Sequence, residues 1–162
     1  MKRLIVTFIV GGALGAAAGF AAGIFIYPFI FLADIEAAEK VDDPTKPVIA
    51  TGKFIHANPS DPVHYGKGSV TVYEGVVHLE KDFEVGPGPK FHVYLVPLES
   101  VTPSTEVPKT MFVDLGRLRA FKGSQNFPIP DGIALRDYKS VVIWCEHFEV
   151  LISPASLAFK QP

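Results

Sequence analysis

The strongest pattern in the chain is a long apolar run close to its start. No charged residue occurs from Leu4 to Ala33. As a helix with a rise of about 1.5 Å per residue, this run measures roughly 45 Å, against a hydrocarbon core of about 30 Å. Cleavable signal peptides usually have a shorter apolar region, of about 7–15 residues. The run therefore predicts a transmembrane anchor over residues 1–33, with cleavage near Ala33 or Ala38 as the alternative.

A different pattern fills the chain after residues 34–48, a proline-containing stretch that we interpret as a linker. Short runs rich in β-branched and aromatic residues follow it, separated by Pro, Gly and Asp turns. In one of them Val70 and Val72 alternate with Thr71 and Tyr73, as expected when the two faces of a strand differ. The runs predict eight strands: Ile49–Ile55, Gly68–Glu74, Val76–Lys81, Phe91–Pro97, Thr110–Leu115, Gly123–Ile129, Lys139–Glu146 and Glu149–Ser153.

These strands predict an all-β fold for the larger part of the chain. Eight short strands with no long helical period among them favour an antiparallel β-sandwich over residues 49–160. A compact β-barrel is the alternative, because it would show the same alternation. The length is ample for a single hydrophobic core in either case.

The charges around the apolar run predict how the chain is oriented. Lys2 and Arg3 precede the run, and the positive-inside rule then leaves the N-terminus in the cytoplasm. We expect a single-pass protein of the cell membrane with its C-terminal domain outside the cytoplasm. The formal net charge of −2 and the pI near 6.2 give no electrostatic reason to expect nucleic acid as a partner.

The apolar run also carries a stripe of small residues on one face of the predicted helix. Small side chains at a spacing of four let two helix backbones approach closely and dimerise. Glycine and alanine are, however, also common in membrane helices that stay monomeric. A homodimer through this face is expected to involve four glycines: Gly11, Gly15, Gly19 and Gly23.

Familiar catalytic patterns are absent from the sequence. It contains no Cys-x-x-Cys, no His-Glu-x-x-His, no serine nucleophile elbow and no dinucleotide-binding glycine pattern. Gly86–Pro89 is glycine-rich, but its prolines lack the N–H groups that a phosphate needs. It is better interpreted as a stiff loop that leads into the next strand. The five histidines show no local metal-ligand spacing, although His56 and His64 flank one loop. We therefore expect no metal site and no hydrolase, and whether the chain is an enzyme stays open.

The only cysteine, Cys145, lies in the predicted strand Lys139–Glu146, next to the only tryptophan. Alternation places Cys145 on one apolar face of this strand and Trp144 on the other, which indicates a strand central to the fold. A buried free cysteine behaves as a small apolar residue. If the strand continues through His147, a nearby imidazolium would instead make the thiol more reactive. An unpaired cysteine outside the cytoplasm is uncommon, so a structural and a functional role both stay open.

Three segments together resemble the DM-thirteen (DM13) domain, a family often labelled an electron-transfer domain. They are GPKFHVYLVPL (88–98), DLGRLRAFKGSQNFPIP (114–130) and YKSVVIWCEHFEVLISPASL (138–157), with a fainter similarity over residues 52–75. The resemblance covers about residues 50–158 and is similar to the bacterial, membrane-anchored form. It implies a β-sandwich in which the characteristic cysteine of the family corresponds to Cys145. His147 lies outside the family motif, and the segment Arg119–Lys122 departs from it in a loop.

The resemblance implies a role for Cys145 as a bare redox thiol or as the ligand of a prosthetic group such as haem. We then expect a membrane-anchored, extracytoplasmic redox module in which Trp144 and Phe148 shield the thiol and a partner protein exchanges electrons with it. The alternative is a non-catalytic module that presents loops to a protein or a glycan, with Cys145 as packing. The loops in question are Asn58–Tyr65 and Pro97–Pro108.

Overall fold

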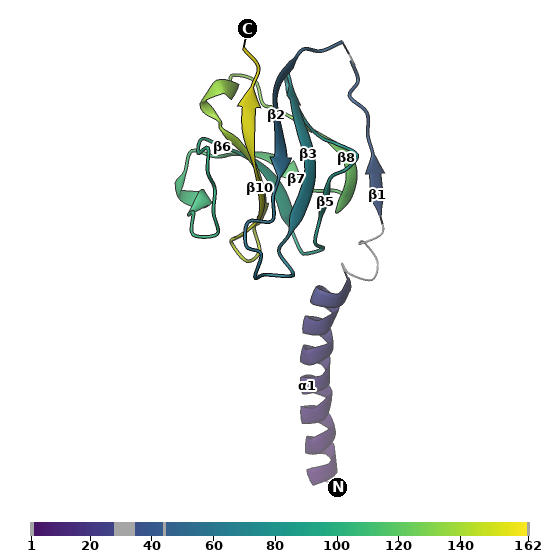
Figure 1. The fold of residues 1–162 in the computed structure, drawn as a ribbon. Helices are drawn as coiled ribbons and strands as arrows, with labels where there is room; N and C mark the ends of the chain where they lie inside the picture. The colour runs from purple at the N-terminus through teal and green to yellow at the C-terminus, as the bar shows by residue number, and fades with distance from the viewer. Residues whose placement is uncertain (1, 28–34, 44, 162) are drawn as a thin grey trace.

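The computed structural model describes residues 2–27, 35–43 and 45–161. An N-terminal helix, α1 (Lys2–Tyr27), stands apart from a β-domain (Figure 1). Its part Lys2–Ile24, with a mean hydropathy of 2.1, is long and apolar enough to cross a membrane, as a signal sequence also would be. Nothing in the described structure buries this stretch. The rest of the predicted anchor, residues 28–33, lies outside the described residues.

The described part of the chain contains ten strands, which pair antiparallel except for one parallel pair, β1 with β8. The pairing order is β1-β8-β4-β3-β2-β10-β9-β6-β7, and β5 pairs with both β3 and β8. The predicted all-β domain behind one apolar helix is confirmed. The bounds are β1 (Glu36–Ala38), β2 (Val48–Phe54), β3 (Gly66–Tyr73), β4 (Val76–Leu79), β5 (Glu84–Val85), β6 (Phe91–Val96), β7 (Val113–Arg117), β8 (Lys122–Pro128), β9 (Ser140–Cys145) and β10 (Val150–Phe159), with short 3₁₀ turns at Val107–Lys109 and Leu135–Asp137.

All eight predicted strands are present, and the largest difference is at the end of the last one. β10 does not end near Ser153 but continues through Pro154 to Phe159. The register of its pairing with β9 shifts between Leu151 and Ser153, ahead of the proline, and Pro154 itself pairs with Val142. The carbonyl oxygen of Pro154 still accepts a hydrogen bond from the backbone N–H of Ile55, at 3.1 Å. The strand therefore passes from its pairing with β9 to its pairing with β2.

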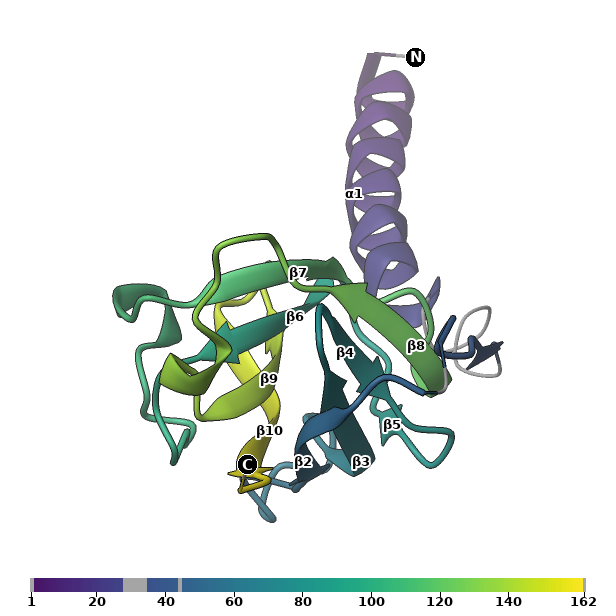
Figure 2. The same ribbon diagram turned by 90° about the horizontal axis from the view of Figure 1, so that it is seen from above.

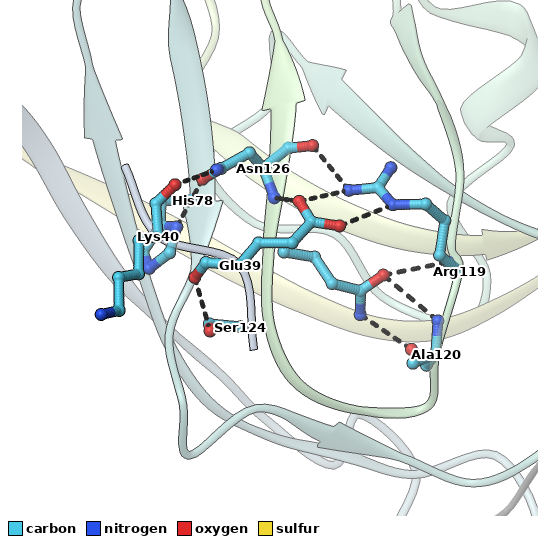
Figure 3. Close-up of polar contacts among 8 residues, drawn as sticks. Glu39, Lys40, His78, Arg119, Ala120, Ser124 and Asn126 are labelled. Carbon is cyan, nitrogen blue, oxygen red and sulfur yellow. Dashed lines mark hydrogen bonds and ion pairs between the residues drawn. The ribbon is translucent and has the colours of Figure 1, made fainter. Parts of the chain in front are cut away.

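Part of the predicted linker over residues 34–48 is instead an edge strand, β1, that pairs with β8. The contacts continue past its end (Figure 3). Arg119 donates to the Glu39 carboxylate through Nε at 2.9 Å and Nη2 at 2.8 Å, and the backbone N–H of Asn126 donates to the same group at 2.8 Å. These partners lie 80 or more positions away in sequence, so no local pattern around residues 34–48 could have indicated the strand.

Strand β9 is buried on both faces, which confirms its predicted central place. Cys145 and its alternate neighbours face the main core, which lies between β6, β7 and β9 on one side and β2, β3 and β4 on the other (Figure 2). Val142 and Trp144 face a second apolar cluster, which the loop carrying Val101 and Val107 covers. The two walls face each other as sandwich layers do, but the pairing of β2 with β10 runs on between them. The sandwich layout itself stays a prediction.

Candidate functional site

Cys145 is the last residue of β9 and closes the core at one end of the domain. Its neighbours across the sheet are Phe91 on β6 and Val150 on β10. The residue is 1% exposed, and its thiol donates a hydrogen bond to the carbonyl oxygen of Pro89, with 3.2 Å between sulfur and oxygen. Trp144 lies on the opposite face of β9, so the expectation that it shields the thiol is wrong.

The turn after β9 decides the surroundings of the sulfur. The strand ends at Cys145, so His147 lies in the turn, is exposed, and packs its ring against Phe148 with a centroid distance of 4.7 Å. Burial raises the pKa of the Cys145 thiol, while backbone hydrogen bonds from Phe148 and His147 to the sulfur lower it by less. The thiol is therefore neutral at rest, and the imidazole of His147 is not what tunes it.

A pocket of about 300 Å³ lies over Cys145, which forms part of its wall. Most of the residues that line it come from three segments: the loop after β2, the glycine–proline loop before β6, and the turn between β9 and β10. The ends of β6, β9 and β10 supply the others, Phe91, Cys145 and Val150. Phe148 lines the pocket together with Cys145, as expected for a side chain that covers the thiol. The residues lining the pocket include no Lys, Arg, Asp or Glu, so the cavity favours an uncharged occupant.

The glycine–proline loop forms one wall because two of its residues have no Cβ. A Cβ on Gly86 would overlap the carbonyl oxygen of Val63, and a Cβ on Gly88 would overlap the ring of Phe91. The prediction that this loop leads into a strand is confirmed, since β6 begins at Phe91. Its position against the pocket was not predicted, because sequence alone does not show what a loop packs against.

The opposite rim of the pocket carries an aspartate–histidine pair. Nδ1 of His64 lies 2.6 Å from Oδ2 of Asp61, and Oδ1 of Asp61 accepts the backbone N–H groups of Val63 and His64. The hydrogen bond from His64 is the largest of the contributions that lower the pKa of Asp61 to about 2. His56 joins the same loop through Nε2, 2.7 Å from the backbone oxygen of Asp61. The two histidines thus converge on one residue as hydrogen-bonding partners.

A second cluster of polar side chains lies on the other face of the same sheet, and sequence analysis missed it. The ligand atoms of His92, Asp114 and Glu146 lie within 4.8 Å of one another, a group that could hold a metal ion. Nδ1 of His92 is 2.9 Å from Asp114, its Nε2 is 3.5 Å from Glu146, and Lys90 lies 2.9 Å from Glu146. The three members are separated by 22 or more positions, so no spacing rule brings them together. The ammonium group of Lys90 already pairs with one of these carboxylates, that of Glu146.

The residues around Cys145 do not fit a haem. A volume of about 300 Å³ is at the lower end of the range for pockets that hold drug-sized ligands, about 300–1,000 Å³, and a haem is larger than most of these. The sulfur is covered, and its proton is committed to Pro89. An iron–sulfur bond would require the turn after β9 to open.

Comparison with known families adds one finding. A family model described as "Electron transfer DM13" matches residues 59–157, which is more than half of the chain. The matched region begins within the loop that carries Asp61 and His64 and ends within β10, so it contains all three pocket segments. No curated protein and no solved structure matches the chain.

Proposed function

The chain belongs to the DM13 family, and from this membership we propose that it is a membrane-anchored electron-transfer module whose working site is the pocket over Cys145. One observation carries this proposal. Cys145, which carries the only thiol of the chain, is almost fully buried, yet it forms part of the wall of a pocket. A cysteine that served packing alone would need no cavity next to it.

The proposed role of Cys145 is to contact a compact redox molecule held in the pocket. Burial raises the pKa of the thiol, so it is a poor nucleophile towards dissolved disulfides. Because the sulfur is covered, a bulky partner protein cannot contact it directly. A small uncharged molecule can use the apolar walls and reach the sulfur, with the backbone N–H groups of His147 and Phe148 nearby.

The proposed location follows from α1 and the charges before it. An unburied apolar helix of 26 residues supports a single-pass anchor. Lys2 and Arg3 support a cytoplasmic N-terminus, which places the β-domain outside the cytoplasm. Self-association through the face of Gly11, Gly15, Gly19 and Gly23 belongs to the same proposal, as does exchange of electrons with a partner protein.

A second candidate function is a non-catalytic binding module, and one observation favours it. The loop Asn58–Tyr65 is partly exposed and supplies a wall of the pocket, so it presents a surface to a ligand without any redox step. The other loop proposed for this role, Pro97–Pro108, packs Val101 and Val107 into the second apolar cluster. In this candidate Cys145 fills space and its oxidation state never changes.

Labelling of Cys145 under oxidising and reducing conditions distinguishes the redox module from the non-catalytic binding module. Membranes containing the full-length protein are held oxidised with ferricyanide or reduced with dithionite, washed, and treated with N-ethylmaleimide before and after unfolding in urea. The redox proposal predicts that native labelling of Cys145 differs at least about threefold between the two poises. A difference that disappears on unfolding indicates a bound redox ligand, and one that persists indicates oxidation of the thiol itself. Equal labelling at both poises contradicts the redox proposal, with Cys145→Ser as the blank.

A further inference from the structure

The loops that line the pocket over Cys145 lie at the end of the domain that is nearest to α1. The strand registers place the glycine–proline loop at this end. Glu36, the first residue of β1, pairs with Lys122, and Lys122 pairs with Glu84 of β5. Val85 comes next along β5 and leads into the glycine–proline loop of the pocket. In Figure 1 the turn between β9 and β10 and the loop between β2 and β3 lie at this same end, above the top of the helix.

The length of chain between α1 and β1 keeps this end close to the membrane. Tyr27 ends the helix and Glu36 begins β1, nine steps later. Even a fully extended chain spans at most about 3.3–3.6 Å per residue, so the two residues are at most about 30 Å apart. Because β1 starts at the pocket end, the mouth of the pocket stays within reach of the bilayer surface.

Exposed apolar side chains gather at the same end. Among the described residues after α1, six large apolar side chains are exposed: Ile35, Ile55, Val63, Leu98, Met111 and Phe148. Four of them lie at the pocket end, and two of those four, Val63 and Phe148, line the pocket itself. Leu98 and Met111 lie at the far end, beyond β6 and before β7. An apolar end beside a membrane anchor is suited to the interfacial layer of a bilayer.

Besides the thiol, the lining residues offer one polar side chain to a ligand, His64. The carboxylate of Asp61 accepts the Nδ1 proton of His64 at 2.6 Å, which fixes the ring. Nε2 of His64 can then accept a hydrogen bond from a ligand hydroxyl when the ring is neutral, and can donate one to a ligand carbonyl when the ring is charged. A ligand that exists in both a carbonyl and a hydroxyl form matches this pair in both of its states.

We infer that the pocket over Cys145 takes its redox ligand from the bilayer, and that this ligand is of the quinone class. A quinone is an uncharged substituted ring with two oxygens and a hydrocarbon tail. The ring fits a cavity of about 300 Å³ without charged walls, one oxygen meets His64, and the tail leaves between Val63 and Phe148. This inference rests on the anchoring and the redox pocket proposed above.

Ligand protection tests the quinone directly. Full-length protein in lipid nanodiscs is treated with N-ethylmaleimide, alone, with decylubiquinone, or with decylbenzene, which has the tail but no oxygens. We expect decylubiquinone to slow labelling of Cys145 at least about fivefold and decylbenzene to leave it unchanged. His64→Phe should abolish the protection, whereas His147→Phe, an exposed histidine in the turn that does not line the pocket, should retain it.

Two results overturn the quinone inference while leaving the redox pocket standing. The first is that decylbenzene protects Cys145 as well as decylubiquinone does. The second is that decylubiquinone gives no protection. In both cases the labelling of Cys145 still depends on redox poise. If the reagent never reaches Cys145 in the ligand-free protein, the pocket is closed and both proposals fail.

Quenching by brominated lipids tests the position of the pocket mouth. Phe148→Trp places a fluorescent reporter at the rim of the pocket. Met111→Trp places one at the far end of the domain, where Met111 is 83% exposed. Trp144 contributes the same background to both variants. We expect strong quenching of the first reporter by brominated acyl chains and none of the second. Equal quenching of the two reporters contradicts entry from the bilayer.

Discussion

The thiol of Cys145 donates a hydrogen bond to the carbonyl oxygen of Pro89, 3.2 Å away. This contact joins the end of β9 to the glycine–proline loop and holds the sulfur against the pocket. Only a protonated thiol can donate in this way. The contact and the rise in thiol pKa on burial therefore agree on a neutral group at rest.

Replacing the thiol should cost a moderate amount of stability. Cys145→Ala removes a buried sulfur and leaves the Pro89 carbonyl without its donor, so we expect the free energy of unfolding to fall by about 1–2 kcal/mol. Cys145→Ser keeps a donor, so its free energy of unfolding should fall by less. Urea denaturation of the full-length chain measures both. No loss in the alanine variant would mean that the contact does not contribute.

The raised thiol pKa predicts a loss of stability at alkaline pH. In the unfolded chain the thiol ionises near its ordinary pKa. At the same pH the folded chain still holds the proton, because burial raises the pKa of the thiol. Stability from this group is complete at neutral pH and declines from about pH 8 upward until the folded thiol also ionises. The urea midpoint of the wild type should fall more steeply over this range than that of Cys145→Ala. Parallel pH profiles would show that Cys145 is not the titrating group.

Filling the glycine–proline loop should close the pocket. A Cβ on Gly88 would overlap the Phe91 ring, so Gly88→Ala should lower stability by about 1–3 kcal/mol and slow labelling of Cys145. Gly132→Ala is the matched control. Its φ of 83° makes alanine strained by about 1–2 kcal/mol, but nothing lies within 4 Å of the new Cβ. Loss of stability alone would speed labelling in both variants, so labelling that is no slower in Gly88→Ala than in Gly132→Ala would contradict closure of the pocket.

A buried glutamine supports the loop between β7 and β8. Oε1 of Gln125 accepts from the backbone N–H groups of Arg119 and Ala120, and its Nε2 donates to the carbonyl of Ala120. Gln125→Leu leaves three backbone groups without partners, and we expect a loss of about 3 kcal/mol or more. The control Thr51→Ser alters an exposed side chain on β2. A small loss for Gln125→Leu would show that water replaces the side chain.

Local patterns predicted most of the fold, since each strand carries its own alternation and turn residues. The strand β1 escaped prediction because it pairs with residues 122–124 of β8, far away in sequence, and Arg119 and Asn126 bond Glu39 just beyond its end. The site was predicted only in part. Alternation placed Cys145 and Trp144 on opposite faces correctly, but the pocket depends on three loops meeting at one end. Loop packing depends on tertiary contacts that no local periodicity contains, which is why His64 and Gly88 could not be assigned to the site in advance.

The central claim is that a small uncharged molecule reaches Cys145 through the pocket while the domain stays folded. The direct measurement compares two thiol reagents on full-length protein in nanodiscs: neutral methyl methanethiosulfonate and its anionic sulfonatoethyl analogue. Each rate is normalised to the rate in urea. We predict that the neutral reagent reacts at least about tenfold faster than the anionic one, at a rate above that of global unfolding. Reaction of both reagents only at the unfolding rate would contradict the claim and leave Cys145 as a packing residue.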